Sequence, residues 1–173
     1  MPRLQFGPRE QLRRPRRMGR VLPCCEVALP ECEFCRIGAR EVLAESVYED
    51  AKNVAFFPLR PAAIGHTLVI PKSHYTDLFD LPGPPLASLM QAVSTVGTGL
   101  RAALRPDGMN VISSAGAAAS QTIFHVHVHL VPRWRDDRFG SIWPSSGPTV
   151  GAEIADRLRR ELRTSEPGPL PIR

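Results

Sequence analysis

The chain has 173 residues, of which 43% are hydrophobic; this is enough for one compact core and small for two. No run of about 18 apolar residues occurs, and the arginine-rich start lacks the apolar stretch and small-residue cleavage site of an export signal. These features exclude a membrane-spanning protein, and we expect a soluble, cytoplasmic domain.

The net charge of +5 is concentrated at the N-terminus. Residues 1–24 contain seven arginines and one glutamate, a net charge of +6, and the remaining 15 basic and 16 acidic residues give residues 25–173 a charge of −1. The arginines are interrupted by prolines and lack an apolar face, which predicts a disordered basic extension. Nucleic-acid binding through this tail stays open beside the simpler interpretation of a solvated extension.

The first half of the chain predicts short strands. Residues 43–48 and 53–59 are typical of strands, and the polar turn at residues 49–52 predicts that they form a hairpin. Residues 66–70 predict a third strand, closed by a proline because proline cannot donate to a central ladder. The Leu-Pro-Gly-Pro-Pro sequence at residues 81–85 then predicts a break.

The second half begins with the main predicted helix, residues 86–104, which has apolar residues at spacings of three and four. These residues are Leu86, Leu89, Met90, Val93, Val96, Leu100 and Leu104. Residues 109–114 and 123–131 predict strands on either side of a small-residue loop. Helical spacing returns at residues 150–162. Together these elements predict an α+β fold.

Three histidines alternate with apolar residues near the end of the last predicted strand. A period of two places His125, His127 and His129 on one face of that strand and valines on the other. Because each imidazole needs hydrogen-bond partners for two nitrogens, packing gives little reason for such a row. The pattern favours a chemical site over a chance cluster. A metal site is a second interpretation, since alternating histidines can share one zinc ion.

The sequence His-Val-His-Val-His-Leu-Val at residues 125–131 matches a His-x-His-x-His-x-x signature with hydrophobic x, and the chain resembles the histidine triad (HIT) family. The other matching segments, in the family's order, are Tyr48–Asp50, Val54–Phe57, Gly65–His74 and Gln121–His125. The resemblance covers about residues 32–134. It implies an antiparallel sheet with one long helix and a C-terminal helix.

The resemblance also implies how the histidines act. The middle one, His127, would attack an α-phosphorus and form a covalent nucleotidyl-imidazole, with its other nitrogen donating to a backbone carbonyl. His129 would contact the phosphate oxygens or the leaving group, and Gln121 with Thr122 would stabilise developing charge. Phosphorylase and transferase relatives usually carry glutamine at the position of His129, so histidine favours a hydrolase.

Substrate contacts are expected from two further segments. Asp50 aligns with the acidic residue that contacts ribose in relatives, although a turn residue closing the hairpin is the alternative. Relatives usually have glycine in place of Ser120 and asparagine in place of Ser114, so the phosphate loop is expected to differ in shape. Its contacts would come from backbone amides and from Ser120, Gln121 and Thr122.

A metal site is predicted at Cys32-Glu-Phe-Cys35, because two thiolates at this spacing can share one ion. The resemblance supplies the two missing ligands as His74 and His125, and a filled Cys2His2 set implies structural Zn²⁺. Two buried thiols and a redox dithiol are the alternatives. His66 lies nearby and is interpreted as a hydrogen-bonded core histidine.

The sequence therefore predicts a nucleotide hydrolase that cleaves dinucleoside polyphosphates or nucleoside phosphoramidates. A nucleotidyltransferase or phosphorylase, and a zinc-stabilised nucleotide-binding module without turnover, are the alternatives. The catalytic domain is expected at residues 25–150, with a C-terminal helix and Pro-rich tail at 151–173. Kinship implies a homodimer. The segment at residues 134–143 is interpreted either as an influence on substrate choice or as a surface with ion pairs.

Overall fold

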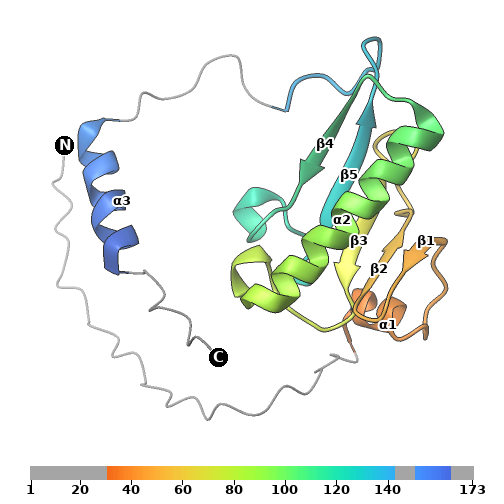
Figure 1. The fold of residues 1–173 in the computed structure, drawn as a ribbon, viewed down its shortest axis with the longest axis horizontal. Coiled ribbons are helices and arrows are strands. Elements are labelled where there is room, and N and C mark those ends of the chain that lie inside the picture. The colour runs from red at the N-terminus through yellow and green to blue at the C-terminus, as the bar shows by residue number, and fades with distance from the viewer. Residues whose placement is uncertain (1–30, 143–150, 165–173) are drawn as a thin grey trace, which may run out of the picture. The chain divides into compact units, whose positions relative to one another are not determined.

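A computed structural model describes residues 31–142 and 151–164 of the chain (Figure 1). The predicted basic extension at residues 1–24 and the Pro-rich tail lie outside these ranges. The chain divides into two compact units, Met1–Arg135 and Asp136–Arg173, and each is described by itself. Within the described residues, no helix is long and apolar enough to cross a membrane.

The first unit is built on a five-stranded antiparallel sheet, as the predicted α+β class requires. The strands are β1 (Ser46–Glu49), β2 (Asn53–Phe56), β3 (Thr67–Pro71), β4 (Gly108–Ile112) and β5 (Val128–Arg133), in the spatial order β1-β2-β3-β5-β4. The helices are α1 (Glu33–Gly38), the long α2 (Gly83–Leu104) and two short 3₁₀ turns, η1 (Leu78–Asp80) and η2 (Ala117–Ala119). The predicted hairpin is confirmed as β1 and β2.

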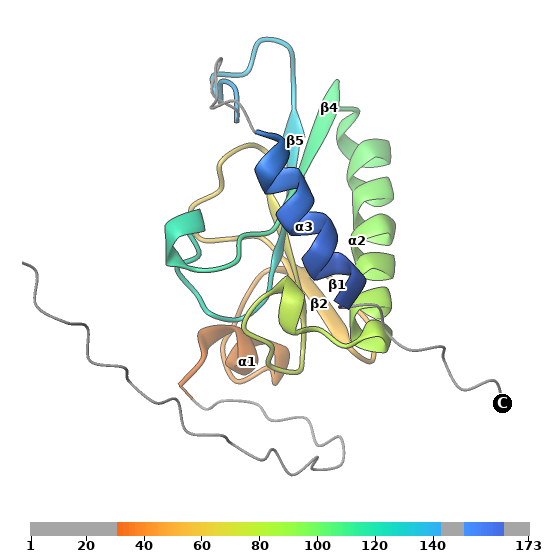
Figure 2. The same ribbon diagram turned by 90° about the vertical axis from the view of Figure 1, so that its left-hand side faces the viewer.

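The sheet separates two apolar clusters. Its central strands β2 and β3 are buried, because one cluster packs against each face. Figure 2 shows α2 against one face, with α1 and η2 on the other. The α2 side includes Ala55, Val69, Leu89, Val93, Val96, Val126, Val128 and Leu130, and the α1 side includes Phe34, Ile37, Val54, Phe56, Leu68 and Ile70. Alternate residues of one strand therefore enter different environments.

Helix α2 corrects two expectations. The predicted break at residues 81–85 is wrong in part, since the helix begins at Gly83 with prolines in its first turn, where a missing N–H removes no helical bond. Met90 is 42% exposed, although it was expected on the buried stripe. It follows the fully buried Leu89 by one residue, about 100° around the helix, and so lies at the border of the stripe.

The strand predicted at residues 123–131 is shifted along the chain, because β5 begins only at Val128. The register sets Val69 opposite Val128, and β3 ends two residues further on at Pro71, which has no N–H to continue the ladder. Instead, the Val126 N–H donates to the Tyr75 carbonyl at 2.7 Å. The inward and outward alternation nevertheless continues through the irregular residues before β5.

The second unit contains α3 (Ala152–Thr164), close to the helix predicted at residues 150–162. Its apolar residues Ile154, Leu158 and Leu162 are 56%, 57% and 59% exposed. The helical spacing was therefore predicted correctly, and these three side chains remain more than half accessible in the described residues.

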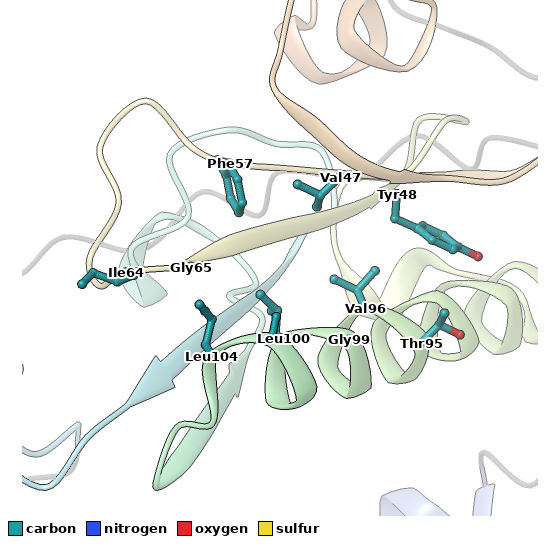
Figure 3. Close-up of a pocket in the computed structure, with 11 residues that line it drawn as sticks. Val47, Tyr48, Phe57, Ile64, Gly65, Thr95, Val96, Gly99, Leu100 and Leu104 are labelled. Atoms are coloured by element: carbon teal, nitrogen blue, oxygen red, sulfur yellow. The ribbon is translucent and has the colours of Figure 1, made fainter.

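A hollow of about 600 Å³ lies on the α2 side of the sheet (Figure 3). Apolar side chains from β1, α2 and the segment before β3 line it, including Val47, Ile64 and Leu100. Its two hydroxyl side chains are already bonded, Tyr48 to the Asp50 carboxylate and Thr95 to the Gln91 carbonyl. No histidine or cysteine of the described residues lines this hollow.

Candidate active site and metal centre

The four predicted metal ligands come together at one end of the sheet. Cys32 and Cys35 lie at the start and in the middle of α1, His74 follows β3, and His125 precedes β5. Their four ligand atoms lie within 4.8 Å of one another. The Sγ to Nδ1 distances are 3.5 Å for Cys32 to His125, 3.4 Å for Cys35 to His74 and 3.5 Å for Cys35 to His125. These match the edges of about 3.5 Å of a tetrahedron with zinc bond lengths.

His125 is prepared as a ligand by its own hydrogen bond. Its Nε2–H donates to the Pro71 carbonyl at 2.9 Å, so the lone pair is on Nδ1, which faces both sulfurs. The residue is fully buried, and burial lowers its pKa to about 4, which keeps it neutral at neutral pH. A soft set of two thiolates and two imidazoles fits zinc, and it leaves no coordination position for a substrate.

The second triad histidine, His127, donates from the opposite ring nitrogen to that used by His125. Its Nδ1–H donates to the carbonyl of His125 at 2.7 Å, as expected, which places the lone pair on Nε2. The ring is buried, with 7% exposure, and the Ser113 hydroxyl donates to the backbone carbonyl of His127 at 3.0 Å. An imidazole with a free Nε2 lone pair is a nucleophile that needs no separate base.

A chain of hydrogen bonds determines the tautomer of His129. The Ala62 N–H donates to Nδ1 of His66 at 3.0 Å, so the neutral His66 ring carries its proton on Nε2. That Nε2–H donates to Nδ1 of His129 at 2.9 Å, which leaves the His129 proton on Nε2. The His129 ring lies 4.9 Å from that of His127. A hydrogen-bond donor on His129 therefore lies beside the His127 ring.

Burial lowers the pKa of two histidines beside His127. Burial is the main cause that lowers the pKa of His129 to about 4, with smaller contributions from His127 and His66. Burial also lowers the pKa of His66. His66 is a buried, hydrogen-bonded histidine as predicted, but its bond to His129 was missed. Its place in the matched segment Gly65–His74 was the available signal.

Gly65 shows why His66 can reach this position. Its φ is +75°, and a Cβ added there would lie 2.3 Å from Cδ1 of Leu104. Only glycine fits both the left-handed backbone and the close approach of α2. The turn before β3 thereby places His66 within hydrogen-bond distance of His129.

Asp50 does not join the triad. One carboxylate oxygen accepts the backbone N–H groups of Lys52 and Asn53, both at 2.7 Å, and the other accepts the Tyr48 hydroxyl at 2.8 Å. The Asn53 amide also donates to Asp50 and to Ser88 of α2, so this cluster lies on the α2 side of the sheet. The turn interpretation accounts for these contacts, and the ribose contact of Asp50 stays a prediction.

Gln121 is a brace for the predicted phosphate loop. Its buried side-chain oxygen accepts the Gly116 N–H at 2.7 Å, and its amide donates to the carbonyls of Thr76 and Ile123. With both amide hydrogens used, it has no donor left for developing charge. These contacts make Gln121 a support of the loop, and its direct catalytic role stays a prediction.

The remaining loop residues are more open. Ser120 has an exposed side chain and a φ of +68°, the left-handed region that favours the glycine expected there from relatives. Ser114 is half-buried. Thr122 is exposed and lines a hollow of about 430 Å³ beside the metal centre, together with Cys32 and His74.

Comparisons with known proteins agree with this geometry. Residues 39–136 match the model of the HIT domain. The chain is 32% identical over 136 residues to Protein hit of Bacillus subtilis, covering 73% of this chain and 94% of that protein. It is 34% identical over 115 residues to the adenylylsulfatase HINT3 of Arabidopsis thaliana, covering 66% of this chain and 57% of that protein.

A solved structure is similar as well. The crystal structure of a Zn-bound histidine triad family protein from Mycobacterium smegmatis superposes with a TM-score of 0.60 and 35% identity, covering 79% of this chain and 98% of that one. The protein described here belongs to the HIT family, and its sequence and fold place it in the branch with a Cys-x-x-Cys zinc motif.

Proposed function

We propose that this protein is a nucleotide hydrolase that cleaves at the α-phosphate of dinucleoside polyphosphates or nucleoside phosphoramidates through a covalent intermediate on His127. The observation that carries the proposal is the ordered set of tautomers. The His125 carbonyl holds the Nδ1–H of His127 and leaves Nε2 as the nucleophile, and the bond from His66 leaves a donor on Nε2 of His129.

In the first step, the His127 Nε2 lone pair forms a bond to the α-phosphorus, and the bond from phosphorus to the leaving oxygen or nitrogen breaks. The His129 Nε2–H donates to the phosphate or to the leaving group as charge develops there. In the second step, water attacks the same phosphorus and the P–N bond to His127 breaks. The proton that water loses replaces the one that the leaving group took up in the first step. The products are a nucleoside monophosphate, the protonated leaving group and the free imidazole.

Phosphate contacts are proposed for the loop before the triad. The exposed hydroxyls of Ser120 and Thr122 supply donors there, and Gln121 holds the loop in shape. The name adenylylsulfatase of the Arabidopsis relative supports an enzyme rather than a module that only binds nucleotide.

Structural zinc is part of the proposal. Cys32, Cys35, His74 and His125 would hold the ion, which would cross-link α1 to the segments beside β3 and β5. Thiolate ligands of this kind also favour the reducing cytoplasm as the location. The zinc named in the Mycobacterium smegmatis structure supports this metal.

A homodimer is proposed from kinship and from the edge of the sheet. Strand β4 ends the sheet and carries Val111, which is 54% exposed. An open edge strand with an apolar side chain is a surface on which a second copy can extend the sheet. The molar mass in solution, measured by light scattering, tests this: a monomer at micromolar concentration would contradict it.

Binding of nucleic acid is proposed only for the basic residues 1–24. Deletion of these residues should abolish salt-sensitive binding to RNA or DNA and leave nucleotide turnover intact. Binding that is unchanged after the deletion would remove this part of the proposal.

Turnover on a panel of diadenosine polyphosphates and adenosine phosphoramidates tests the main proposal, with wild type compared with His127→Ala, with and without added phosphate. Wild type should turn over, and His127→Ala should be inactive. An adenosine phosphoramidate separates the two reactions, because its leaving group carries no phosphate. In the presence of added phosphate, nucleoside monophosphate from this substrate identifies a hydrolase, whereas nucleoside diphosphate identifies a phosphorylase. If wild type and His127→Ala were both inactive but bound nucleotide equally well, the result would favour a zinc-stabilised binding module without turnover.

A further inference from the structure

Phe34 occupies the middle of the cysteine motif and contacts three other rings. It is 4% exposed, and its ring centroid lies 5.3 Å from that of His127, 5.9 Å from that of His125 and 5.5 Å from that of Phe56. The interplanar angles are 85°, 73° and 74°. These edge-to-face contacts are the preferred arrangement of aromatic pairs. Phe34 therefore contacts a metal ligand and the nucleophilic ring at once.

One hydrogen bond and two ring contacts orient His127. Its Nδ1–H is fixed by the His125 carbonyl, which holds one edge of the ring but permits tilting about that bond. Two ring neighbours limit the tilt, His129 at 4.9 Å and Phe34 at 5.3 Å. Attack on phosphorus requires the Nε2 lone pair to point along the line of the bond that breaks. Loss of the Phe34 ring would loosen this direction without removing the nucleophile.

The position of Phe34 depends in turn on the metal centre. Helix α1 has only six residues, too short to be stable alone, and its first turn is flanked by Cys32 and Cys35. A metal ion bound to both sulfurs would fix the backbone on either side of Phe34. The same ion would fix His125, whose carbonyl holds His127.

We propose that Phe34 is a positioning residue for His127, and that it transmits the occupancy of the metal centre to the chemical step. This inference rests on the proposed function of the triad. Phe34 would then affect the rate of the chemical step, in addition to its contribution to the apolar core. Substrate affinity should be unaffected, since Phe34 acts through the direction of the His127 ring.

Phe56 offers a matched control, because it is also an aromatic residue of the α1-side cluster, is 3% exposed and contacts Phe34. The experiment compares full-length zinc-loaded Phe34→Leu and Phe56→Leu with wild type. It measures zinc content, kcat, KM, the single-turnover rate of nucleotidyl-enzyme formation, and the imidazole ¹⁵N chemical shifts of His127. Phe34→Tyr, which retains the ring, tests for rescue.

We expect Phe34→Leu to retain stoichiometric zinc and to lower kcat and the rate of adduct formation about tenfold, with KM within about twofold of wild type. The ¹⁵N shifts of His127 should move, and Phe34→Tyr should restore most of the rate. Phe56→Leu should keep kcat within about twofold. Wild type stripped of zinc by a chelator should show the His127 shift changes of Phe34→Leu.

Two results would overturn the inference: unchanged kcat and ¹⁵N shifts in zinc-loaded Phe34→Leu, or an equal loss of kcat in Phe56→Leu, which would indicate general softening of the core. An inactive wild type would instead overturn the proposed function. The ¹⁵N shifts do not depend on turnover, so in that case they alone decide whether Phe34 positions His127.

Discussion

The two faces of the sheet differ in what holds their side chains in place. On the α2 side, Val126 and Val128 pack among apolar neighbours, and only the size and shape of their side chains matter there. On the α1 side, the alternating histidines are each fixed by one specific bond, to the Pro71 carbonyl, to the His125 carbonyl and to His66. Substitutions on the first face are therefore expected to change stability, and those on the second face to change metal binding or rate.

The largest effect is expected at the metal centre. The double substitution Cys32→Ser and Cys35→Ser should remove stoichiometric zinc and lower the free energy of unfolding by about 4 kcal/mol, because the proposed ion would cross-link three segments. Metal analysis and thermal unfolding of purified protein measure both. Wild type without stoichiometric zinc after metal-replete expression would end the Cys2His2 hypothesis.

The next largest effect is expected on the rate. His129→Asn should lower kcat about 100-fold, because the donor beside the nucleophile is lost or misplaced. Steady-state kinetics with the best substrate of the panel measures the change, and zinc content serves as the control, since His129 is not a ligand. Retention of wild-type kcat would show that His129 takes no part in the chemical step.

The neutral histidines predict a dependence of stability on pH. The pKa of His129 is about 4 in the folded chain and near 6.5 in the unfolded chain, and the pKa of His66 is also lowered by burial. Between these values the unfolded chain binds more protons, so stability is full above about pH 6.5 and falls as the pH decreases toward 4, by at most about 3 kcal/mol for His129.

Thermal unfolding measured at pH 7, 6, 5 and 4.5 checks this dependence. His129→Asn should weaken the fall between pH 6.5 and 4.5, because one of the depressed groups is absent. Identical pH dependence in the two proteins would contradict the assignment of that loss to His129.

A smaller effect is expected on the opposite face. Val128→Ala should lower the free energy of unfolding by about 2 kcal/mol through a cavity beneath α2, and kcat of the folded protein should stay within about twofold. Val128 is 2% exposed and adjoins His127 in sequence, so the variant probes the two faces one residue apart. A loss of kcat comparable to that of His129→Asn would remove the distinction between the faces.

The smallest effect concerns the loop before the triad. Ser120 has a φ of +68°, which costs a residue with a Cβ about 1 kcal/mol relative to glycine. Ser120→Gly should therefore stabilise the protein by up to about 1 kcal/mol in denaturant unfolding. Destabilisation would show that the Ser120 side chain contributes more than its backbone conformation costs.

The apolar pattern predicted the fold well, because periodicity reports which side chains face a core. It placed the hairpin, β3, α2 and α3 and assigned the valines and histidines to opposite faces. It misplaced the start of β5. Pairing with β3 stops at Pro71, which has no N–H to donate, and the sequence of residues 123–131 alone does not show which residue of β3 lies opposite. It also took the prolines before Leu86 as a break, although the first helical turn tolerates them.

The candidate site was predictable in its ligands and triad, and less so in its supports. Cys32, Cys35, His74 and His125 lie together as the family pattern implied. The bond from His66 to His129, the Gln121 brace and the closed turn at Asp50 depend on which atoms the tertiary structure brings within hydrogen-bond distance. A one-dimensional pattern gives residue types and spacing, whereas tautomers and satisfied donors require the fold.

The central claim is that Nε2 of His127 carries the nucleotidyl group during turnover. Alkaline quenching of a single turnover in the cold, followed by peptide mass mapping at alkaline pH, which preserves a phosphorus–nitrogen bond, tests it most directly. We expect a nucleotidyl adduct on the peptide that contains His127, formed at least as fast as kcat and absent in His127→Ala. An adduct on another residue, or turnover by His127→Ala at the wild-type rate, would contradict it.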